Sequence, residues 1–195
     1  MKWILASASP RRKELLTRIG LDFEVIVSDA DENIEEELKP DELVKALSEI
    51  KARAVWEECK KNRDMSDVAV IGSDTIVFHN GTVLGKPKDE EDAFRMLRSL
   101  SGETHSVFTG VTLILPKEEI VQFASETKVT FAELSDEEIL RYIATKDPMD
   151  KAGSYGIQSL GGAFVKRIEG EYATVVGFPI GEFCEILRKK GLFGV

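Results

Sequence analysis

The sequence contains few of the residues that build zinc sites or disulfide frameworks. Its 195 residues include two cysteines and two histidines. Cys59 and Cys184 lie far apart in the chain, no Cys-x-x-Cys pair is present, and only His79 and His105 could assist them. We therefore expect neither a zinc ion nor a disulfide framework.

Long apolar runs and a surplus of positive charge are also absent. No run approaches the roughly 20 residues that a membrane-spanning helix needs. The start, Met1–Trp3, lacks the apolar core of a secretion signal, so we expect a cytoplasmic protein without a membrane partner. The net charge of −9 argues against a nucleic-acid partner, because such an interface needs a large basic surface. A local basic pocket for a small phosphorylated ligand is still compatible with this charge.

The stretch from Trp3 to Leu16 predicts a buried strand, a tight loop and a helix that begins at Pro10. A helix N-terminus offers unpaired N–H groups and a partial positive charge, which suit an anion such as phosphate. The same joint carries hydroxyl groups and cations on Ser7, Ser9, Arg11, Arg12 and Lys13. The alternative is an ordinary surface helix start, capped by Ser9, with solvated basic side chains.

The rest of the chain predicts a mixture of helices and strands. Apolar residues at helical spacing predict helices over 40–61 and 90–100, one that starts with a capping box at 135–138, and one after Pro179. Strands are predicted over 22–28, 68–78, 104–115 and 119–134, and a hairpin over 163–168 and 172–176. The Asn80-Gly81 pair predicts a two-residue hairpin turn. No repeat or flexible linker is present, so we expect a single domain over 1–195.

Asp74 stands in the most apolar stretch of the chain, Val68–Phe78, which Gly72–Thr75 is predicted to interrupt. Burying a carboxylate costs free energy unless the group is paired or binds a metal, so we expect a catalytic or metal-binding residue. A cap on a local turn is the alternative. Glu32 belongs to an acidic cluster, 29–32, that follows a predicted strand, where ligands for hard cations are often placed; a solvated acidic loop is the alternative.

Two lysines lie where they could reach a ligand. Lys51 is on the flank of the predicted helix 40–61, and a solvated surface lysine is the equal alternative. Lys86 lies between Gly85 and Pro87, where the chain is held extended at a strand end.

The glycine-rich segment 147–162 has little periodicity, and long loops in compact domains tend to be functional. Its polar candidates are Asp150, Lys151 and Gln158, and Tyr155 could pack or stack. His79 is predicted to be a surface residue and His105 a hydrogen-bonded structural one.

These candidates fit the cleavage of a phosphoanhydride. Strand ends and helix starts of an α/β sheet converge on one crevice, where cations would screen a polyphosphate and carboxylates would hold Mg²⁺ and deprotonate water. The candidate cations and carboxylates are Arg11, Arg12, Lys51, Lys86, Lys151, Glu32, Asp74 and Asp150. Neither a Gly-x-x-x-x-Gly-Lys-Ser/Thr loop nor a Gly-x-Ser-x-Gly elbow is present, so a P-loop enzyme and a covalent nucleophile are not expected.

The chain resembles the Maf, or septum-formation-inhibitor, family of nucleotide pyrophosphatases. The resemblance runs in order along nearly the whole chain, through Leu5–Leu16, Asp31-Glu32, Lys51-Ala52, Gly72–Thr75, Leu84–Pro87, Leu100–His105, Asp150–Gln158 and Val176–Pro179. It implies a mixed, twisted central sheet flanked by helices, with two lobes around a cleft, similar to inosine triphosphate pyrophosphatase. It also implies hydrolysis of nucleoside triphosphates to monophosphate and pyrophosphate with Mg²⁺ or Mn²⁺, and a homodimer.

The resemblance also assigns roles by position. Asp74 would be the proton acceptor that activates water, and Glu32 would hold the metal with it. Lys86 would act on the phosphates as a catalytic group. The other positions implied to bind substrate are Ser7, Ser9, Arg11, Arg12 and Lys51.

Base choice would rest on Arg11, Thr75 and Gln158, whose pattern matches the branch that acts on dTTP and UTP, with CTP and modified pyrimidine nucleotides as further candidates. A glutamine amide and a threonine hydroxyl can each donate and accept hydrogen bonds at a base edge. The chain departs from this branch at Ser159 and Phe178, where glycine and leucine are usual.

Three alternatives stay open. One is the branch that acts on 7-methyl-GTP. Another is a nucleotidyltransferase, although its phosphate loop needs glycines where this chain has Ala6, Ala8 and Pro10. The third is a non-enzymatic, nucleotide-binding regulator of cell division, which would not need a buried Asp74.

Overall fold

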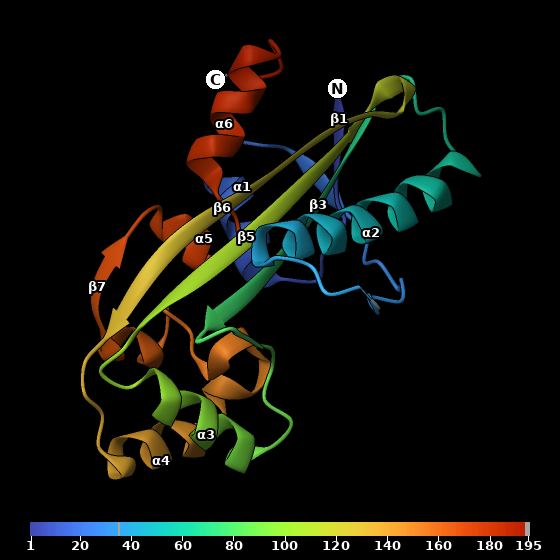
Figure 1. Ribbon diagram of the computed structural model, residues 1–195. Coiled ribbons are helices and arrows are strands. Elements are labelled where there is room, and N and C mark those ends of the chain that lie inside the picture. The colour runs from blue at the N-terminus through green and yellow to red at the C-terminus, as the bar shows by residue number, and fades with distance from the viewer. Residues whose placement is uncertain (35, 194–195) are drawn as a thin grey trace. The chain divides into compact units, whose positions relative to one another are not determined.

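The computed structural model describes residues 1–34 and 36–193 (Figure 1). Its helices are α1 (Pro10–Arg18), α2 (Pro40–Lys60), α3 (Glu90–Leu100), α4 (Asp136–Ala144), α5 (Tyr172–Val176) and α6 (Ile180–Lys189). Its strands are β1 (Lys2–Leu5), β2 (Phe23–Val25), β3 (Val68–His79), β4 (Thr82–Leu84), β5 (Thr104–Leu115), β6 (Glu119–Phe131) and β7 (Val165–Glu169). Short 3₁₀ turns are η1 (Pro116–Glu118), η2 (Asp147–Asp150), η3 (Ala152–Ser154) and η4 (Leu160–Phe164). Within the described residues, no helix has the length and apolar character needed to cross a membrane.

The strands form a mixed sheet in the order β2-β1-β3-β5-β6-β7, with β4 paired to β3. β1 is parallel to both of its neighbours, with Leu5 opposite Val25 of β2 and Ile71 of β3. β4 is antiparallel to β3, and β7 is antiparallel to β6. This combination confirms the predicted mixed α/β class.

The chain divides into two compact units. Unit 1 consists of Met1–Asp74, Thr109–Ser125 and the chain from Gly177 onward, and unit 2 consists of Thr75–Phe108 and Glu126–Val176. The strands β3, β5 and β6 each contribute residues to both units. The expectation of a single domain over 1–195 stays a prediction.

In unit 1, α2 lies against strands that carry glycines at the points of contact. A Cβ atom on Gly72 would lie 2.1 Å from the backbone oxygen of Ser48, and one on Gly110 would lie 2.3 Å from that of Val44. Ser48 Oγ on α2 and Thr112 Oγ1 on β5 are 2.7 Å apart and share a buried hydrogen bond. The missing side chains therefore allow the helix backbone to approach the sheet closely.

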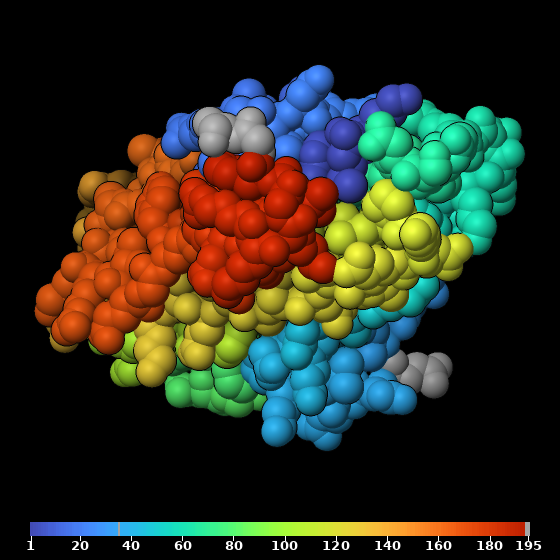
Figure 2. Space-filling view, turned by 90° about the horizontal axis from the view of Figure 1, so that it is seen from above, coloured from blue at the N-terminus to red at the C-terminus, as the bar shows by residue number. Residues whose placement is uncertain are grey.

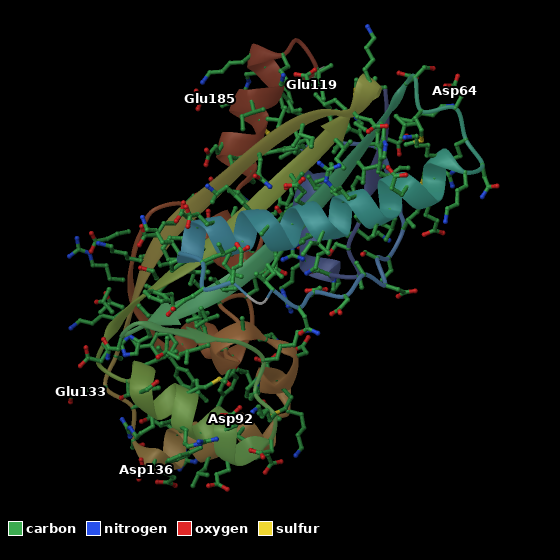
Figure 3. All side chains as sticks on the ribbon, turned by 45° about the vertical axis from the view of Figure 1, so that its right-hand side comes forward. Asp64, Asp92, Glu119, Glu133, Asp136 and Glu185 are labelled. Carbon is green, nitrogen blue, oxygen red and sulfur yellow. The ribbon has the colours of Figure 1, made fainter. Side chains whose placement is uncertain are left out.

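On the surface of unit 1, the end of α6 lies beside the start of β6. Figure 2 shows these two segments side by side, where Lys190 Nζ lies 2.5 Å from Glu119 Oε1. In unit 2, α3 and α4 lie together (Figure 1), and Arg98 on α3 donates to Asp136 over 2.9 Å. The acidic surplus of the sequence is largely solvent-exposed, as Figure 3 shows for the labelled Asp64, Glu119, Glu133, Asp136 and Glu185.

Several local signals predicted their elements correctly. Ser9 caps α1 by accepting from the Arg12 N–H at 3.4 Å, and Pro10 is the first helical residue. Ser135 opens α4 with the predicted capping box. Asn80 (φ 48°) and Gly81 (φ 78°) form the turn between β3 and β4.

Four predictions were wrong. The strand over 22–28 is limited to Phe23–Val25, because β2 is an edge strand whose apolar residues face solvent: Val25 is 39% and Val27 51% exposed. The hairpin predicted over 163–176 is β7 followed by helix α5, since β7 pairs with β6 instead. The predicted interruption at Gly72–Thr75 is absent, because β3 continues through it from Val68 to His79. His79 is buried, not exposed.

Candidate active site

A cluster of one lysine and two carboxylates lies in unit 1. Lys51 on α2 donates to Asp74 Oδ1 on β3, and its Nζ lies 3.0 Å from Oε2 of Glu32. The side chains of Lys51 and Asp74 are each 14% exposed, and that of Glu32 is 48% exposed. One ammonium group therefore links the two carboxylates that the sequence analysis named together.

The close approach of α2 to β3 brings these groups together. Gly72 and Asp74 are two residues apart on β3, so they share a face of the strand. A Cβ atom on Gly72 would lie 2.8 Å from Cβ of Ala52, the neighbour of Lys51. With no side chain at Gly72, Lys51 lies near enough to reach Asp74.

Arg12 lies at the joint between β1 and α1. Its Nε donates to the carbonyl oxygen of Gly177 at 2.9 Å, and its guanidinium donates to Ser7 Oγ at 3.2 Å. Ser73, next to Asp74, is fully buried and its hydroxyl donates to the same Gly177 oxygen at 3.4 Å. The first loop and the central strand therefore meet at one carbonyl group.

Burial lowers the pKa of Arg12, and the charge of Arg11 lowers it further. The carboxylates of Asp74 and Glu32 act in the opposite direction and raise it. A guanidinium remains protonated at neutral pH even so. Unit 1 thus holds a desolvated, permanent cation within electrostatic range of both candidate carboxylates.

Ser9 and Arg11 lie in unit 1 beside Arg12 in the sequence and are half-buried, whereas Thr75, Lys86 and Gln158 belong to unit 2. Thr75 follows Asp74 on β3 and is half-buried, while Lys86 and Gln158 are exposed. The segments that carry Lys86 and Gln158 are joined, because the Gly153 N–H donates to the Gly85 carbonyl oxygen at 3.0 Å. Gly153 has φ 67°, and a Cβ atom there would lie 2.8 Å from Cγ2 of Val77, so glycine is required on both counts.

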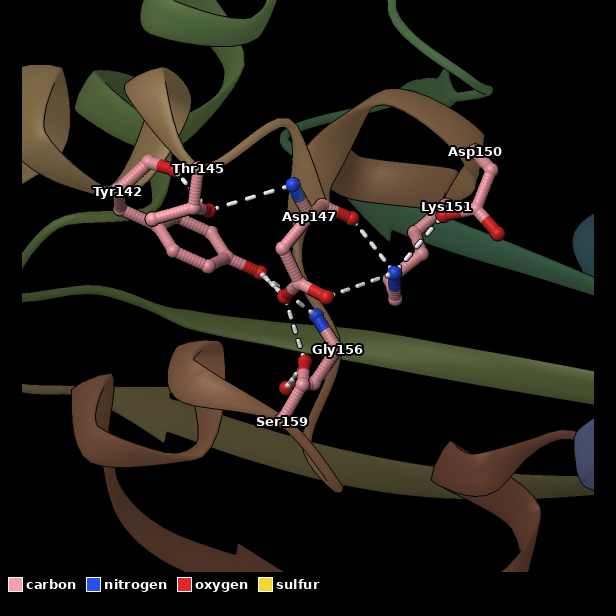
Figure 4. Close-up of polar contacts among 7 residues, drawn as sticks. All are labelled: Tyr142, Thr145, Asp147, Asp150, Lys151, Gly156 and Ser159. Atoms are coloured by element: carbon pink, nitrogen blue, oxygen red, sulfur yellow. Dashed lines mark hydrogen bonds and ion pairs between the residues drawn. The ribbon is translucent and has the colours of Figure 1, made fainter.

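Asp147 is a half-buried hub that the sequence analysis missed (Figure 4). Its Oδ2 accepts from Tyr142 at 2.6 Å and from Ser159 at 2.5 Å, and its Oδ1 accepts from Lys151 at 3.1 Å. Burial by itself raises the pKa of Asp147, but hydrogen bonds from Ser159, Tyr142 and Lys151 outweigh it and lower the pKa. Lys151 also donates to Asp150 at 2.7 Å, so this candidate cation is neutralised within unit 2.

The histidines form a second buried group in unit 2. His105 Nε2 lies 2.8 Å from the Tyr155 hydroxyl, which confirms the prediction of a hydrogen-bonded structural residue. Burial, helped by His79, lowers the pKa of His105 to about 3, so the ring is neutral at physiological pH. His79 is buried, with its ring facing that of His105 and its Nε2 close to the Asn80 amide. The contact between two histidines so far apart in the chain could not be predicted from the sequence.

The donor set fits a metal ion that arrives with a phosphate ligand. Among the described residues, no three His, Cys, Asp or Glu side chains are grouped to hold a metal. Mg²⁺ is commonly bound through one or two carboxylates together with substrate phosphates and water. Glu32 and Asp74 supply such a pair, because both lie beside the Lys51 ammonium.

Comparison with known proteins shows the family to which the chain belongs. The model of the family described as Maf-like protein matches residues 2–190. The chain belongs to this Maf-like family. Among curated relatives, it is 48% identical over 194 residues to a dTTP/UTP pyrophosphatase of Acetivibrio thermocellus, covering 98% of this chain and 96% of the relative. It is 50% identical over 188 residues to a dTTP/UTP pyrophosphatase of Bacillus cytotoxicus, covering 96% and 95%.

Solved structures share the fold of this Maf-like chain. The Staphylococcus aureus Ham1 protein is 12% identical with a TM-score of 0.56, covering 97% of this chain and 100% of that protein. A HAM1 protein from Coxiella burnetii is 11% identical with a TM-score of 0.51, covering 97% and 99%. At such low identity the likeness concerns the fold alone, and it confirms the predicted fold class.

Proposed function

We propose that this chain hydrolyses nucleoside triphosphates, preferably dTTP and UTP, to the monophosphate and pyrophosphate. The observation that carries the proposal is the Lys51-bridged pair of Asp74 and Glu32 within electrostatic range of the half-buried Arg12, in a family whose curated relatives are named dTTP/UTP pyrophosphatases. Phosphoanhydride cleavage needs cations for the phosphates and a carboxylate for water, and unit 1 contains both.

Asp74 accepts the proton of the attacking water in this proposal. Asp74 stands on strand β3 and its side chain is held by Lys51. The side chain therefore loses little conformational freedom when substrate binds. A divalent cation such as Mg²⁺ or Mn²⁺, held by Glu32 and Asp74 when bound, would neutralise phosphate charge and acidify water. Lys51 then limits the repulsion between the two carboxylates.

The phosphates lie at the start of α1 in this proposal. The bonds from Arg12 to Gly177 and Ser7 fix the plane of the guanidinium before substrate arrives. A fixed planar fork matches phosphate oxygens with little further loss of side-chain entropy. Arg11, Lys51, Ser9 and the exposed Lys86 add charge and hydroxyl groups for the triphosphate.

The base is recognised by Arg11, Thr75 and Gln158 in this proposal. Thymine and uracil offer an N–H donor between two carbonyl acceptors, and an amide side chain can pair with one of each. An analogue that leaves such a polar group unpaired is rejected, because buried polar groups without partners cost free energy. The homodimer and the cytoplasmic location also stay proposals, testable by light scattering and by fractionation.

A substrate panel tests the activity. The protein is incubated with dTTP, UTP, CTP and 7-methyl-GTP, with Mg²⁺, with Mn²⁺ and with EDTA, and both products are measured. We expect pyrophosphate from dTTP and UTP without a second substrate, and no turnover with EDTA. A preference for 7-methyl-GTP would favour the branch of the family that acts on that nucleotide. Turnover only with an added sugar phosphate would favour a nucleotidyltransferase. No turnover of any nucleotide would favour a non-enzymatic regulator.

A further inference from the structure

We infer that Asp147 and Ser159 are positioning residues that hold Gln158 in place for recognition of the pyrimidine base. The inference rests on the proposed function and adds two residues to it. Gln158 is exposed and lies in the segment between η3 and η4, and exposed loops are ordinarily mobile. A mobile side chain pays more entropy on binding a ligand than a fixed one.

Gln158 occupies the centre of a tight turn. The Ser159 N–H donates to the Gly156 carbonyl oxygen at 3.2 Å, and the Ser159 hydroxyl lies 3.1 Å from the same oxygen. This is the first-to-fourth residue bond of a β-turn, with Ile157 and Gln158 as its central residues. The position of the Gln158 side chain therefore depends on the two ends of this turn.

The Asp147 carboxylate holds both ends. Its Oδ2 accepts directly from the Ser159 hydroxyl at 2.5 Å, and it accepts from Tyr142, whose hydroxyl in turn accepts from the Gly156 N–H at 3.1 Å (Figure 4). Hydrogen bonds to a charged acceptor are about twice as strong as neutral ones. One half-buried carboxylate thus fixes the first and last residues of the turn.

The packing around the turn is tight. A Cβ atom on Gly156 would lie 2.5 Å from Ser159 Oγ and 2.6 Å from Cε of Lys151, so the turn packs directly on the lysine that also pairs with Asp147. Just before the turn, the Gly153 N–H donates to the Gly85 carbonyl oxygen, which joins this part of the chain to the segment of Lys86. The contacts hold a surface turn in one conformation, which favours a role in presenting Gln158.

Two serine variants test the inference. Ser159→Ala removes the bond to Asp147, and Ser159→Thr keeps a hydroxyl. We expect Ser159→Ala to raise KM for dTTP and UTP about tenfold and to narrow the preference for dTTP over dGTP, with kcat little changed. Ser159→Thr should restore most of the affinity. As a matched control, Ser106→Ala removes a similar serine bond, to Glu126 at 2.6 Å in unit 2, and should leave KM unchanged.

Parallel measurement of Gln158→Ala separates this inference from the proposed function. A raised KM in Gln158→Ala with an unchanged KM in Ser159→Ala overturns the positioning role alone. An unchanged base preference in both variants overturns the role of Gln158 and the inference with it. Calorimetric titration of dTMP makes the same comparison without turnover, and equal affinity of wild type and Ser159→Ala also overturns the inference. A fall of the melting temperature with equal loss of kcat on every nucleotide would mark a merely structural residue.

Discussion

The carbonyl oxygen of Gly177 joins two functional segments at the scale of single residues. It accepts from Arg12 Nε at 2.9 Å and from the Ser73 hydroxyl at 3.4 Å. Gly177 has φ 125°, a conformation that residues with a side chain rarely adopt. The orientation of Arg12 is therefore set by a backbone atom that the sequence holds in place with glycine.

Replacement of Arg12 by lysine tests this orientation. Arg12→Lys keeps the charge but loses the fork that donates to Gly177 and Ser7 at once. We expect KM for dTTP to rise about tenfold, with a smaller change in kcat. Arg18→Lys on the same helix is the control, because Arg18 is exposed and pairs with Glu14 on the surface of α1. Equal KM values for the two variants would show that only the charge of Arg12 matters.

At the scale of elements, the distance between α2 and β3 decides where Lys51 lies. Gly72 faces Ser48 and Ala52 of α2 so closely that any side chain must push the helix away. Overpacking of this kind typically costs about 1–3 kcal/mol. The helix carries Lys51, so the same displacement lengthens the contact from Lys51 to Asp74.

Gly72→Ala should therefore lower both stability and activity. We expect the free energy of unfolding to fall by about 2 kcal/mol or more and kcat to fall with it. Gly85→Ala is the control for stability, since no atom lies within 4 Å of a Cβ atom there. Denaturant unfolding and steady-state kinetics measure both effects. A Gly72→Ala protein as stable as Gly85→Ala would show that α2 is free to shift.

Local signals explain which elements could be predicted from sequence. Pro10, the Asn80-Gly81 pair and the capping box at Ser135 act through their own backbone neighbours, and each predicted its element correctly. Residues 172–176 misled because β-branched residues such as Val175 are typical of strands, whereas here they pack as the short helix α5. The strand predicted over 22–28 was too long, because the alternation of apolar and polar residues does not show that a strand lies at the edge of a sheet.

Long-range contacts explain what could not be predicted at the site. Asp74 was singled out because a carboxylate in an apolar stretch is unusual in a sequence. Glu32 was named because an acidic cluster follows a predicted strand, and Lys51 because it lies on the flank of a helix. The resemblance to the family supplied the roles of all three. Asp147 gave no such signal, since its partners Tyr142 and Ser159 lie on either side of it and meet only in the folded chain. The catalytic and metal-binding roles of Asp74 and Glu32 stay predictions. So do the roles in catalysis or substrate binding of the other candidates, which are Ser7, Ser9, Arg11, Arg12, Lys51, Thr75, Lys86 and Gln158.

At the scale of the whole molecule, the proposed roles are divided between the two units. The carboxylates and Arg12 belong to unit 1, whereas Thr75 and Gln158 belong to unit 2, and β3 passes from one to the other between Asp74 and Thr75. We expect variants of Asp74, Glu32 or Arg12 to act mainly on the chemistry of the phosphates. Variants of Thr75 or Gln158 should act mainly on the choice of base.

The pH dependence of stability should reflect His105. Its pKa is about 3 in the folded chain and about 6.5 when exposed, so the unfolded chain binds a proton that the folded chain does not. Stability from this group is full above pH 6.5 and falls by about 1.4 kcal/mol per pH unit as the pH drops toward 3. His105→Gln should therefore flatten the fall in free energy of unfolding between pH 6.5 and 5. Equal slopes for wild type and variant would contradict a buried neutral ring.

Phosphorus NMR of dTTP hydrolysis tests the central claim most directly. Wild-type protein with Mg²⁺ should convert dTTP to dTMP and pyrophosphate in equal amounts. Asp74→Asn should slow this reaction by about a hundredfold or more while dTTP still binds, because the variant keeps the shape of the side chain but cannot accept the proton. Formation of dTDP and phosphate by the wild type, or full activity of Asp74→Asn, would contradict the account.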